Sequence, residues 1–252
     1  STLSTYTDPL SSIRETDMFP LRDDNPTLTT PWVTVLIITV NMVVWALIEG
    51  FGSPTPLAGA LCDYGLVPAD LLGHMGDNPD IDLGEGLSCR LPSGSRLPTL
   101  FSHMFLHGGW FHLIGNLWFL WIFGDNVEDA TGRSRFLIFY LLAGLAAALT
   151  QILSEPLAVS PMVGASGAIA GIMGAYARLF PGARVQTLII IGFYVSTVYV
   201  PALVVLGLWF FIQLLSGLPS LHGAGAGIAF FAHIGGFVCG FLLIPYLLKP
   251  RN

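Results

Sequence analysis

The stretch from Val185 to Leu248 decides the fold: VQTLIIIGFYVSTVYVPALVVLGLWFFIQLLSGLPSLHGAGAGIAFFAHIGGFVCGFLLIPYLL. Its 64 residues include no Asp, Glu, Lys or Arg. One crossing of a bilayer needs only about 20 apolar residues, and a charge at the bilayer centre costs about 2.5 to 3.5 kcal/mol. We therefore expect this run to fold back at least once, at the turn pattern Ser216-Gly217-Leu218-Pro219-Ser220.

Four earlier charge-free runs extend the same pattern, so the chain is expected to be an all-α, polytopic membrane protein with a six-span transmembrane helical bundle. The spans are expected near 31–49, 105–123, 136–154, 166–180, 201–216 and 227–248. The apolar stretch Thr187–Val200 is short and ends against Pro201, which favours an interfacial or re-entrant connection over a seventh span.

Composition supports a membrane protein and excludes several other classes. Of the 252 residues, 53% are hydrophobic and only 10% are charged, against about 25% charged in soluble proteins. The net charge of −6 provides no basic footprint for nucleic acid. The three Cys form no C-x-x-C pair, which argues against a thiolate metal site.

The distribution of cations predicts the orientation. With a cytoplasmic N-terminus, eight Lys and Arg fall inside, while only Arg90 and Arg96 fall outside, as the positive-inside rule requires. We expect cytoplasmic tails at 1–30 and 249–252, a membrane domain at 31–248, and a long external loop at about 50–104 within it. The first 25 residues contain no apolar stretch of a cleavable signal peptide, so the first span is expected to direct membrane insertion.

Polar residues within the expected spans are candidate functional groups. The second span and its start carry His103, His107, His112 and Asn116, and the third ends near Gln151. The fourth begins Gly164-Ala165-Ser166-Gly167, and the sixth contains His233.

Helix lengths place the serine and the histidine at matching depth. From Ser166 to Phe180 the fourth span covers only about 22 Å at 1.5 Å per residue, whereas a hydrocarbon core is about 30 Å thick. Ser166 is thus expected some 8 Å below the outer surface, and His233 about 9 Å below it, six residues into the sixth span.

Small residues allow these two spans to approach closely. Gly167 and Gly171 lie on one face of the fourth span, and Gly236 and Gly240 share a face with His233 on the sixth. A serine beside a neutral imidazole is an activated nucleophile with its base. Since 156–177 and 185–248 contain no Asp or Glu, the arrangement would be a dyad.

A hydrolytic dyad also needs donors for an oxyanion. The backbone amide of Ser166 at a helix N-terminus is one candidate, and His112 and Asn116, spaced i, i+4, are two more. The alternative for the latter pair is a hydrogen bond between helices. His103 and His107 are read as structural, loop-anchoring or, with Gln151, as lining water access.

These motifs, in this order on the second, fourth and sixth of six spans, resemble the rhomboid intramembrane serine proteases from about Leu100 to Leu248. The resemblance implies that Ser166 is the nucleophile and His233 the general base. It implies that His112, Asn116 and the Ser166 amide form the oxyanion hole, and that His107 is structural. It also implies a substrate: a single-span membrane protein, cleaved near the outer end of its helix.

Two positions depart from the family pattern. A Trp-Arg pair often precedes the second span, but here the sequence reads Arg96-Leu97-Pro98-Thr99, which leaves the loop anchor open. A Tyr often follows the nucleophile by four residues and stacks on the base, but here that residue is Ala170, which leaves open what orients His233. A disulfide between Cys62 and Cys89 in the external loop is a hypothesis that would supply an anchor.

Several alternatives and partners accompany this interpretation. Trp209, Phe210 and Phe211, with the Gly-rich loop 217–227, are expected either to form a lateral gate or to face lipid. A rhomboid-like pseudoprotease would bind membrane helices without cutting them. A zinc transporter using His103, His107 and His112 is disfavoured because no H-E-x-x-H or intramembrane carboxylate joins them. No metal or other cofactor is expected. The expected surroundings are the lipid bilayer of a bacterial or archaeal plasma membrane, and a homo-oligomer is compatible with the sequence.

Overall fold

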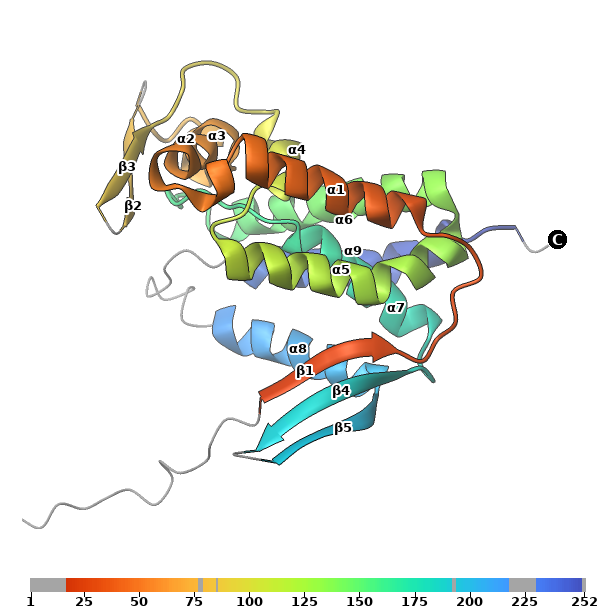
Figure 1. Ribbon diagram of the computed structural model, residues 1–252. Coiled ribbons are helices and arrows are strands. Elements are labelled where there is room, and N and C mark those ends of the chain that lie inside the picture. The colour runs from red at the N-terminus through yellow and green to blue at the C-terminus, as the bar shows by residue number, and fades with distance from the viewer. Residues whose placement is uncertain (1–16, 77–78, 85, 192–193, 218–229, 251–252) are drawn as a thin grey trace, which may run out of the picture.

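The computed structural model describes residues 17–76, 79–84, 86–191, 194–217 and 230–250. Six helices carry the fold, and each overlaps one of the expected spans (Figure 1). They are α1 Trp32–Leu47, α5 Trp110–Thr131, α6 Arg133–Ser154, α7 Ser166–Leu179, α8 Ala202–Gly217 and α9 Phe230–Leu243. The short 3-10 helix Ile244–Tyr246 follows α9. The described part of the chain is therefore predominantly helical.

The helix α7 is the centre of this bundle. Eleven of its residues are buried, and α6, α9 and α5 all pack against it. The outer faces of the surrounding helices are apolar and exposed, as at Leu153 of α6 and Phe211 of α8. Of the helices described, α6 alone is long and apolar enough to cross a membrane by itself, while α1, α8 and α9 are apolar but shorter.

Two small sheets correct the all-α expectation. The strands β4 Arg184–Ile191 and β5 Tyr194–Pro201 form an antiparallel pair, and β1 Asp17–Asp23 adds to β4. The described residues of the stretch 187–200 thus lie in these two strands, because their Val, Ile, Thr and Tyr favour a pleated surface. Figure 1 shows this sheet along one side of the bundle, beside α8.

The second expected span is displaced along the chain. The helix α5 begins at Trp110, after the pair Gly108-Gly109, and continues to Thr131. Its charged last turns hold the N-terminal segment: Asp125 accepts a hydrogen bond from Thr27 at 2.6 Å, and Glu128 one from Thr34 at 2.8 Å. Residues 17–30, expected as a tail, accordingly include β1 and the contact of Thr27 with Asp125. Residues 1–16 and 251–252 of the expected tails lie outside the described residues.

The expected external loop contains several short elements at one end of the bundle (Figure 1). They are the 3-10 helices Gly50–Gly52 and His103–Phe105, the helices α2 Pro54–Tyr64, α3 Pro68–Leu71 and α4 Thr99–Ser102, and the antiparallel strands β2 Asp80–Gly84 and β3 Leu87–Arg90. The hypothesised disulfide joins Cys62 of α2 to Cys89 of β3, and so fastens the hairpin to the helix.

Candidate active site

The helices α7 and α9 touch backbone to backbone. A Cβ atom built on Gly236 would overlap the carbonyl oxygen of Gly167, and a Cβ on Gly240 would overlap that of Gly171. Gly167 and Gly171 in turn face Ala147 and Ala143 of α6. Glycine is thus needed at these positions for helix contact, and this contact fixes how the two helices are placed relative to each other.

The fixed pair of helices brings a serine and a histidine together. Ser166, the first residue of α7, has its Oγ 2.8 Å from Nε2 of His233 on α9, although 67 residues separate them. The other ring nitrogen, Nδ1, lies 2.8 Å from Oε1 of Gln213 on α8. The ring of Trp209, one turn before Gln213, packs on the same imidazole with a centroid distance of 5.6 Å.

The segment before Ser166 has a glycine-specific conformation. Gly164 has φ +121°, which side chains rarely tolerate, and its N–H donates to the carbonyl of His103 at 2.9 Å. A Cβ at Gly164 would lie 2.6 Å from His112 Nε2 and 3.5 Å from Asn116 Nδ2. The backbone that leads into Ser166 therefore passes directly beside these two side chains of α5.

Two donors converge at this point. His112 Nδ1 accepts a hydrogen bond from the Gly108 N–H at 3.2 Å, which leaves the proton of a neutral ring on Nε2. Asn116 Nδ2 is buried and has no hydrogen-bond partner among the described residues. The N–H groups in the first turn of α7 also have no partner within that helix. A buried donor without a partner calls for an explanation, and an oxygen of a bound molecule would supply one.

Two adjoining cavities meet at the serine and the histidine. One, of about 550 Å³, is roofed by Leu61, Asp82 and Leu83 of the loop and walled by Ser160. The other, of about 240 Å³, is apolar and lies between α5 and α8, with Phe119 and Trp209 in its wall. His112, Ser166 and His233 line both. The first is suited to polar molecules, and the second to apolar side chains.

Two further predicted polar residues, His103 and Gln151, lie outside both cavities. His103 is buried, with Nδ1 2.8 Å from the Thr99 carbonyl. Gln151 accepts from the Ala232 N–H at 3.2 Å, and so joins α6 to the start of α9.

His107 stands directly behind the donor histidine. It is buried, and its ring meets that of His112 edge to face at a centroid distance of 5.2 Å. Its backbone N–H donates to the buried carboxylate of Glu49 at 2.6 Å. Glu49 lies at the end of the first expected span, where the sequence alone indicates an interfacial carboxylate.

The three aromatic residues proposed for a gate point in different directions. Trp209 packs on His233, and Phe210 stacks on Phe237 of α9 with centroids 4.5 Å apart. Phe211 is 53% exposed. The rest of that prediction, the loop at 218–227, lies outside the described residues.

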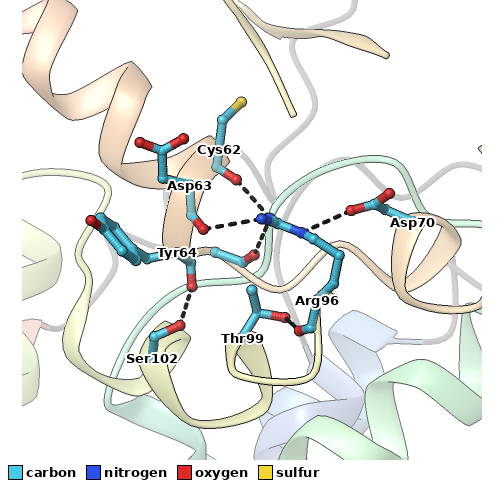
Figure 2. Close-up of polar contacts among 8 residues, drawn as sticks. Cys62, Asp63, Tyr64, Asp70, Arg96, Thr99 and Ser102 are labelled. Carbon is cyan, nitrogen blue, oxygen red and sulfur yellow. Dashed lines mark hydrogen bonds and ion pairs between the residues drawn. The ribbon is translucent and has the colours of Figure 1, made fainter. Parts of the chain in front are cut away.

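Sequence reasoning missed Gln213 and the role of Arg96. Gln213 is a lone amide in the apolar run 202–215, and the rule that selected Gln151 applies to it equally. Arg96 anchors the external loop (Figure 2): it pairs with Asp70 at 2.9 Å and donates to the carbonyls of Cys62 and Asp63 at 2.7 and 3.1 Å. Its partners are distant in sequence, so the motif alone could not identify them.

The anchored loop is connected to the segment that precedes the serine. Leu66 and Met162 exchange two backbone hydrogen bonds, at 3.0 and 2.7 Å. Ser102 Oγ also donates to the Tyr64 carbonyl at 2.7 Å (Figure 2). Arg96 therefore holds the loop residues that brace the approach to Ser166.

A metal-binding arrangement is absent from the described residues. Among them, no three His, Cys, Asp or Glu side chains gather as ligands would. In particular, His103 points its Nδ1 at a carbonyl, while His107 and His112 meet edge to face. The site consists of a serine hydroxyl, an imidazole and hydrogen-bond donors.

Comparison with known proteins gives one family throughout. RHOMBOID-like protein 5 of Arabidopsis thaliana is 28% identical over 90% of this chain and 72% of its own length. Rhomboid protein 1, mitochondrial, of Saccharomyces cerevisiae is 29% identical over 60% of this chain and 42% of its own. Rhomboid protease GluP of Bacillus subtilis is 32% identical over 60% of this chain. The chain spans only 26% of the length of GluP.

A family model described as the Rhomboid domain matches residues 94–250. The match covers well over half of the 252 residues and includes α5 to α9, which carry His112, Asn116, Ser166, Gln213 and His233. The chain belongs to the rhomboid family.

Proposed function

We propose that this protein is an intramembrane serine endopeptidase that cleaves single-span membrane proteins near the outer end of their transmembrane helix. The observation that carries the proposal is the 2.8 Å contact between Ser166 Oγ and His233 Nε2, near the buried Asn116 Nδ2, which has no hydrogen-bond partner among the described residues. Membership of a family of integral membrane proteins, and similarity to a relative named a protease, support it.

The contacts among the side-chain atoms of the site suggest the order of the chemical steps. Ser166 Oγ attacks the carbonyl carbon of the substrate, and its proton passes to His233 Nε2. The oxygen of the tetrahedral intermediate accepts hydrogen bonds from the Ser166 amide, His112 Nε2–H and Asn116 Nδ2. His233 then gives its proton to the leaving amine, and an acyl-serine remains.

Hydrolysis completes the cycle. Water from the larger cavity attacks the acyl carbon, gives its proton to His233, and releases the new carboxyl end as Ser166 Oγ regains a proton. The cavity reaches the site from the external loop, so water need not cross the lipid. A substrate must unwind locally, because a hydrogen-bonded helix withholds its carbonyls from attack.

The membrane arrangement is part of the proposal. The six helices α1 and α5 to α9 would cross the bilayer, with both termini cytoplasmic and the external loop outside. The exposed apolar faces of α6 and α8 would contact lipid. The Cys62–Cys89 bridge favours an oxidising compartment around the loop. We place the protein in the plasma membrane of a bacterium or archaeon on its compact six-helix plan.

Cleavage of a defined reporter tests this function. The purified protein, reconstituted in liposomes, is incubated with a single-span reporter that has a Gly- and Ala-containing outer helix end, and products are identified by mass. We expect one cut near that end, abolished by Ser166→Ala and by His233→Ala. The double variant should be no less active than either single variant, because substitutions within one catalytic unit do not have additive effects.

Matched controls separate chemistry from general damage. Ser134→Ala and His74→Ala remove the same groups at exposed positions, and both should cleave normally. If the wild-type protein binds reporters but never cuts any of a panel that differs in the outer helix end, it is a pseudoprotease and the proposal is wrong.

A further inference from the structure

We infer that Gln213 is a positioning residue that orients His233 and fixes which of its nitrogens carries the proton. The inference rests on the proposed peptidase function. It supplies the partner of the base in a site whose fourth and sixth expected spans contain no carboxylate, and where Ala170 provides no ring to stack on the histidine.

The contacts define the required proton arrangement. Gln213 Oε1 lies 2.8 Å from His233 Nδ1, and an amide oxygen can only accept a hydrogen bond. Nδ1 of a neutral imidazole must then carry the proton, so Nε2 presents its lone pair. Nε2 is the atom that lies 2.8 Å from Ser166 Oγ, where a base is needed. The opposite tautomer would point an N–H at the hydroxyl and could not accept its proton.

The same helix also restrains the plane of the imidazole. Trp209 and Gln213 are four residues apart, so they share a face of α8. The Trp209 ring packs at 5.6 Å from that of His233, tilted by 44°. One contact supports the face of the ring and the other holds its edge, and together they leave little freedom for rotation about χ2.

The helix α8, which carries Gln213, contacts α9 in a different way from α7. The pair α7 and α9 is joined through backbone contacts at five glycines, whereas Phe210, Trp209 and Gln213 link α8 to α9 through side chains. A shift of α8 alone would therefore remove the acceptor from Nδ1 and leave Ser166 and His233 together. Through Gln213, the ability of His233 Nε2 to accept a proton depends on the position of α8.

The tautomer can be measured directly. The whole 252-residue chain is prepared in micelles with ¹⁵N-labelled histidine, and the ring nitrogens of His233, assigned by difference with His233→Ala, are observed by NMR. We expect an Nδ1–H signature in the wild type and in Gln213→Glu, which keeps an acceptor. We expect its loss in Gln213→Met, which keeps the length and shape but accepts only weakly.

Kinetics provide the second measurement. Gln213→Met should lower kcat by about tenfold, the factor that corresponds to one neutral hydrogen bond, with little change in KM. Gln213→Glu should restore at least most of kcat. Leu214→Met, at a half-exposed neighbouring position, is the matched control and should match the wild type. If Gln213→Met does not fold, Gln213→Asn replaces it, because its shorter side chain withdraws the acceptor.

The outcomes separate this inference from the function on which it rests. An unchanged tautomer and unchanged kcat in Gln213→Met, with Ser166→Ala inactive, would overturn the role of Gln213 alone. An Nε2–H signature in the wild type would overturn it as well. Cleavage that survives Ser166→Ala would instead overturn the proposed function.

Discussion

Gly240 of α9 lies so close to Gly171 of α7 that any side-chain atom on Gly240 would overlap the Gly171 carbonyl oxygen. The obstacle is backbone, which cannot rotate away as a side chain can. The helices that carry Ser166 and His233 are therefore held at a separation that glycine alone permits. The geometry of the proposed dyad therefore depends on glycines that themselves perform no chemistry.

Replacement of this glycine tests that dependence. Gly240→Ala should destabilise the protein by about 1 to 3 kcal/mol or more, as overpacking does, and should also abolish labelling of Ser166 by serine-directed probes. Thermal unfolding in micelles and probe incorporation are the measurements. Gly207→Ala on α8, where a Cβ meets nothing within 4 Å, is the control and should change neither. Normal stability and labelling in Gly240→Ala would contradict the close-contact account.

Asn116 is predicted to stabilise the transition state. Its buried Nδ2 has no partner among the described residues, and it lies beside the segment that leads into Ser166. Asn116→Ala should lose about 2.7 to 4 kcal/mol in kcat/KM if Nδ2 is a main oxyanion donor. Asn126→Ala, on the same helix but bonded to the Asn25 carbonyl, should leave kcat unchanged. Equal kcat/KM in Asn116→Ala and wild type would reduce Asn116 to a packing residue.

Arg96 is predicted to stabilise the external loop strongly. Its ion pair with Asp70 is largely buried, with side-chain exposures of 9% and 15%. Removal of one partner from a buried pair costs about 3 to 5 kcal/mol, so Arg96→Met should unfold the loop at a markedly lower temperature. Proteolysis of the loop and thermal unfolding measure this effect.

A second ion pair in the same loop serves as the control. Arg90 and Asp80 are 3.0 Å apart but 66% and 68% exposed. Solvent screens such pairs, so Arg90→Met should resemble the wild type. Equal effects of the two substitutions would show that the burial of Arg96 is irrelevant.

Asp23 of β1 is predicted to make stability depend on pH. Burial raises the pKa of its carboxyl from 3.8 to about 6, the Tyr176 hydroxyl opposes the rise, and the nearby Asp125 adds to it. Between about pH 4 and 6 the unfolded chain has lost a proton that the folded chain keeps. The contribution of Asp23 to the free energy of unfolding is therefore fully present below about pH 4 and is lost as the pH rises through about 6.

The substitution Asp23→Asn isolates this contribution. Asparagine keeps an oxygen to accept from Tyr176 but does not titrate, so the decline in unfolding temperature between about pH 4 and 6 should flatten. Asp80→Asn, at an exposed site, should leave the decline in place. An identical pH profile for Asp23→Asn and the wild type would be incompatible with a raised pKa.

The helices could be predicted from the sequence because the length and apolar composition of each run are local features that indicate a helix in an apolar environment. The proximity of Ser166 and His233 could also be predicted, because the glycine spacing on each helix is a local feature that specifies which helix faces meet. The C-terminal boundary of α5 was harder to predict. Asp125 and Glu128, in its last turns, accept hydrogen bonds from residues near position 30, which are distant in sequence.

The sheet and the loop anchor depend on distant partners. The strand β1 pairs with β4, whose partner residues are as far along the chain as Ile190 is from Asp17. Nothing local in the first 25 residues indicates that pairing. The partners of Arg96 are chiefly backbone carbonyls, which every residue has. Gln213, in contrast, was visible in the sequence as a lone amide in an apolar run.

The central claim is that Ser166 is a nucleophile activated by His233. Incubation of the purified protein with a fluorophosphonate, followed by intact mass and peptide mapping, tests it most directly. We predict one adduct per chain, on Ser166, absent in Ser166→Ala and strongly reduced in His233→Ala, with Ser134→Ala labelled as in the wild type. No adduct in a wild-type protein that is folded, or an adduct that persists in Ser166→Ala, would contradict the account.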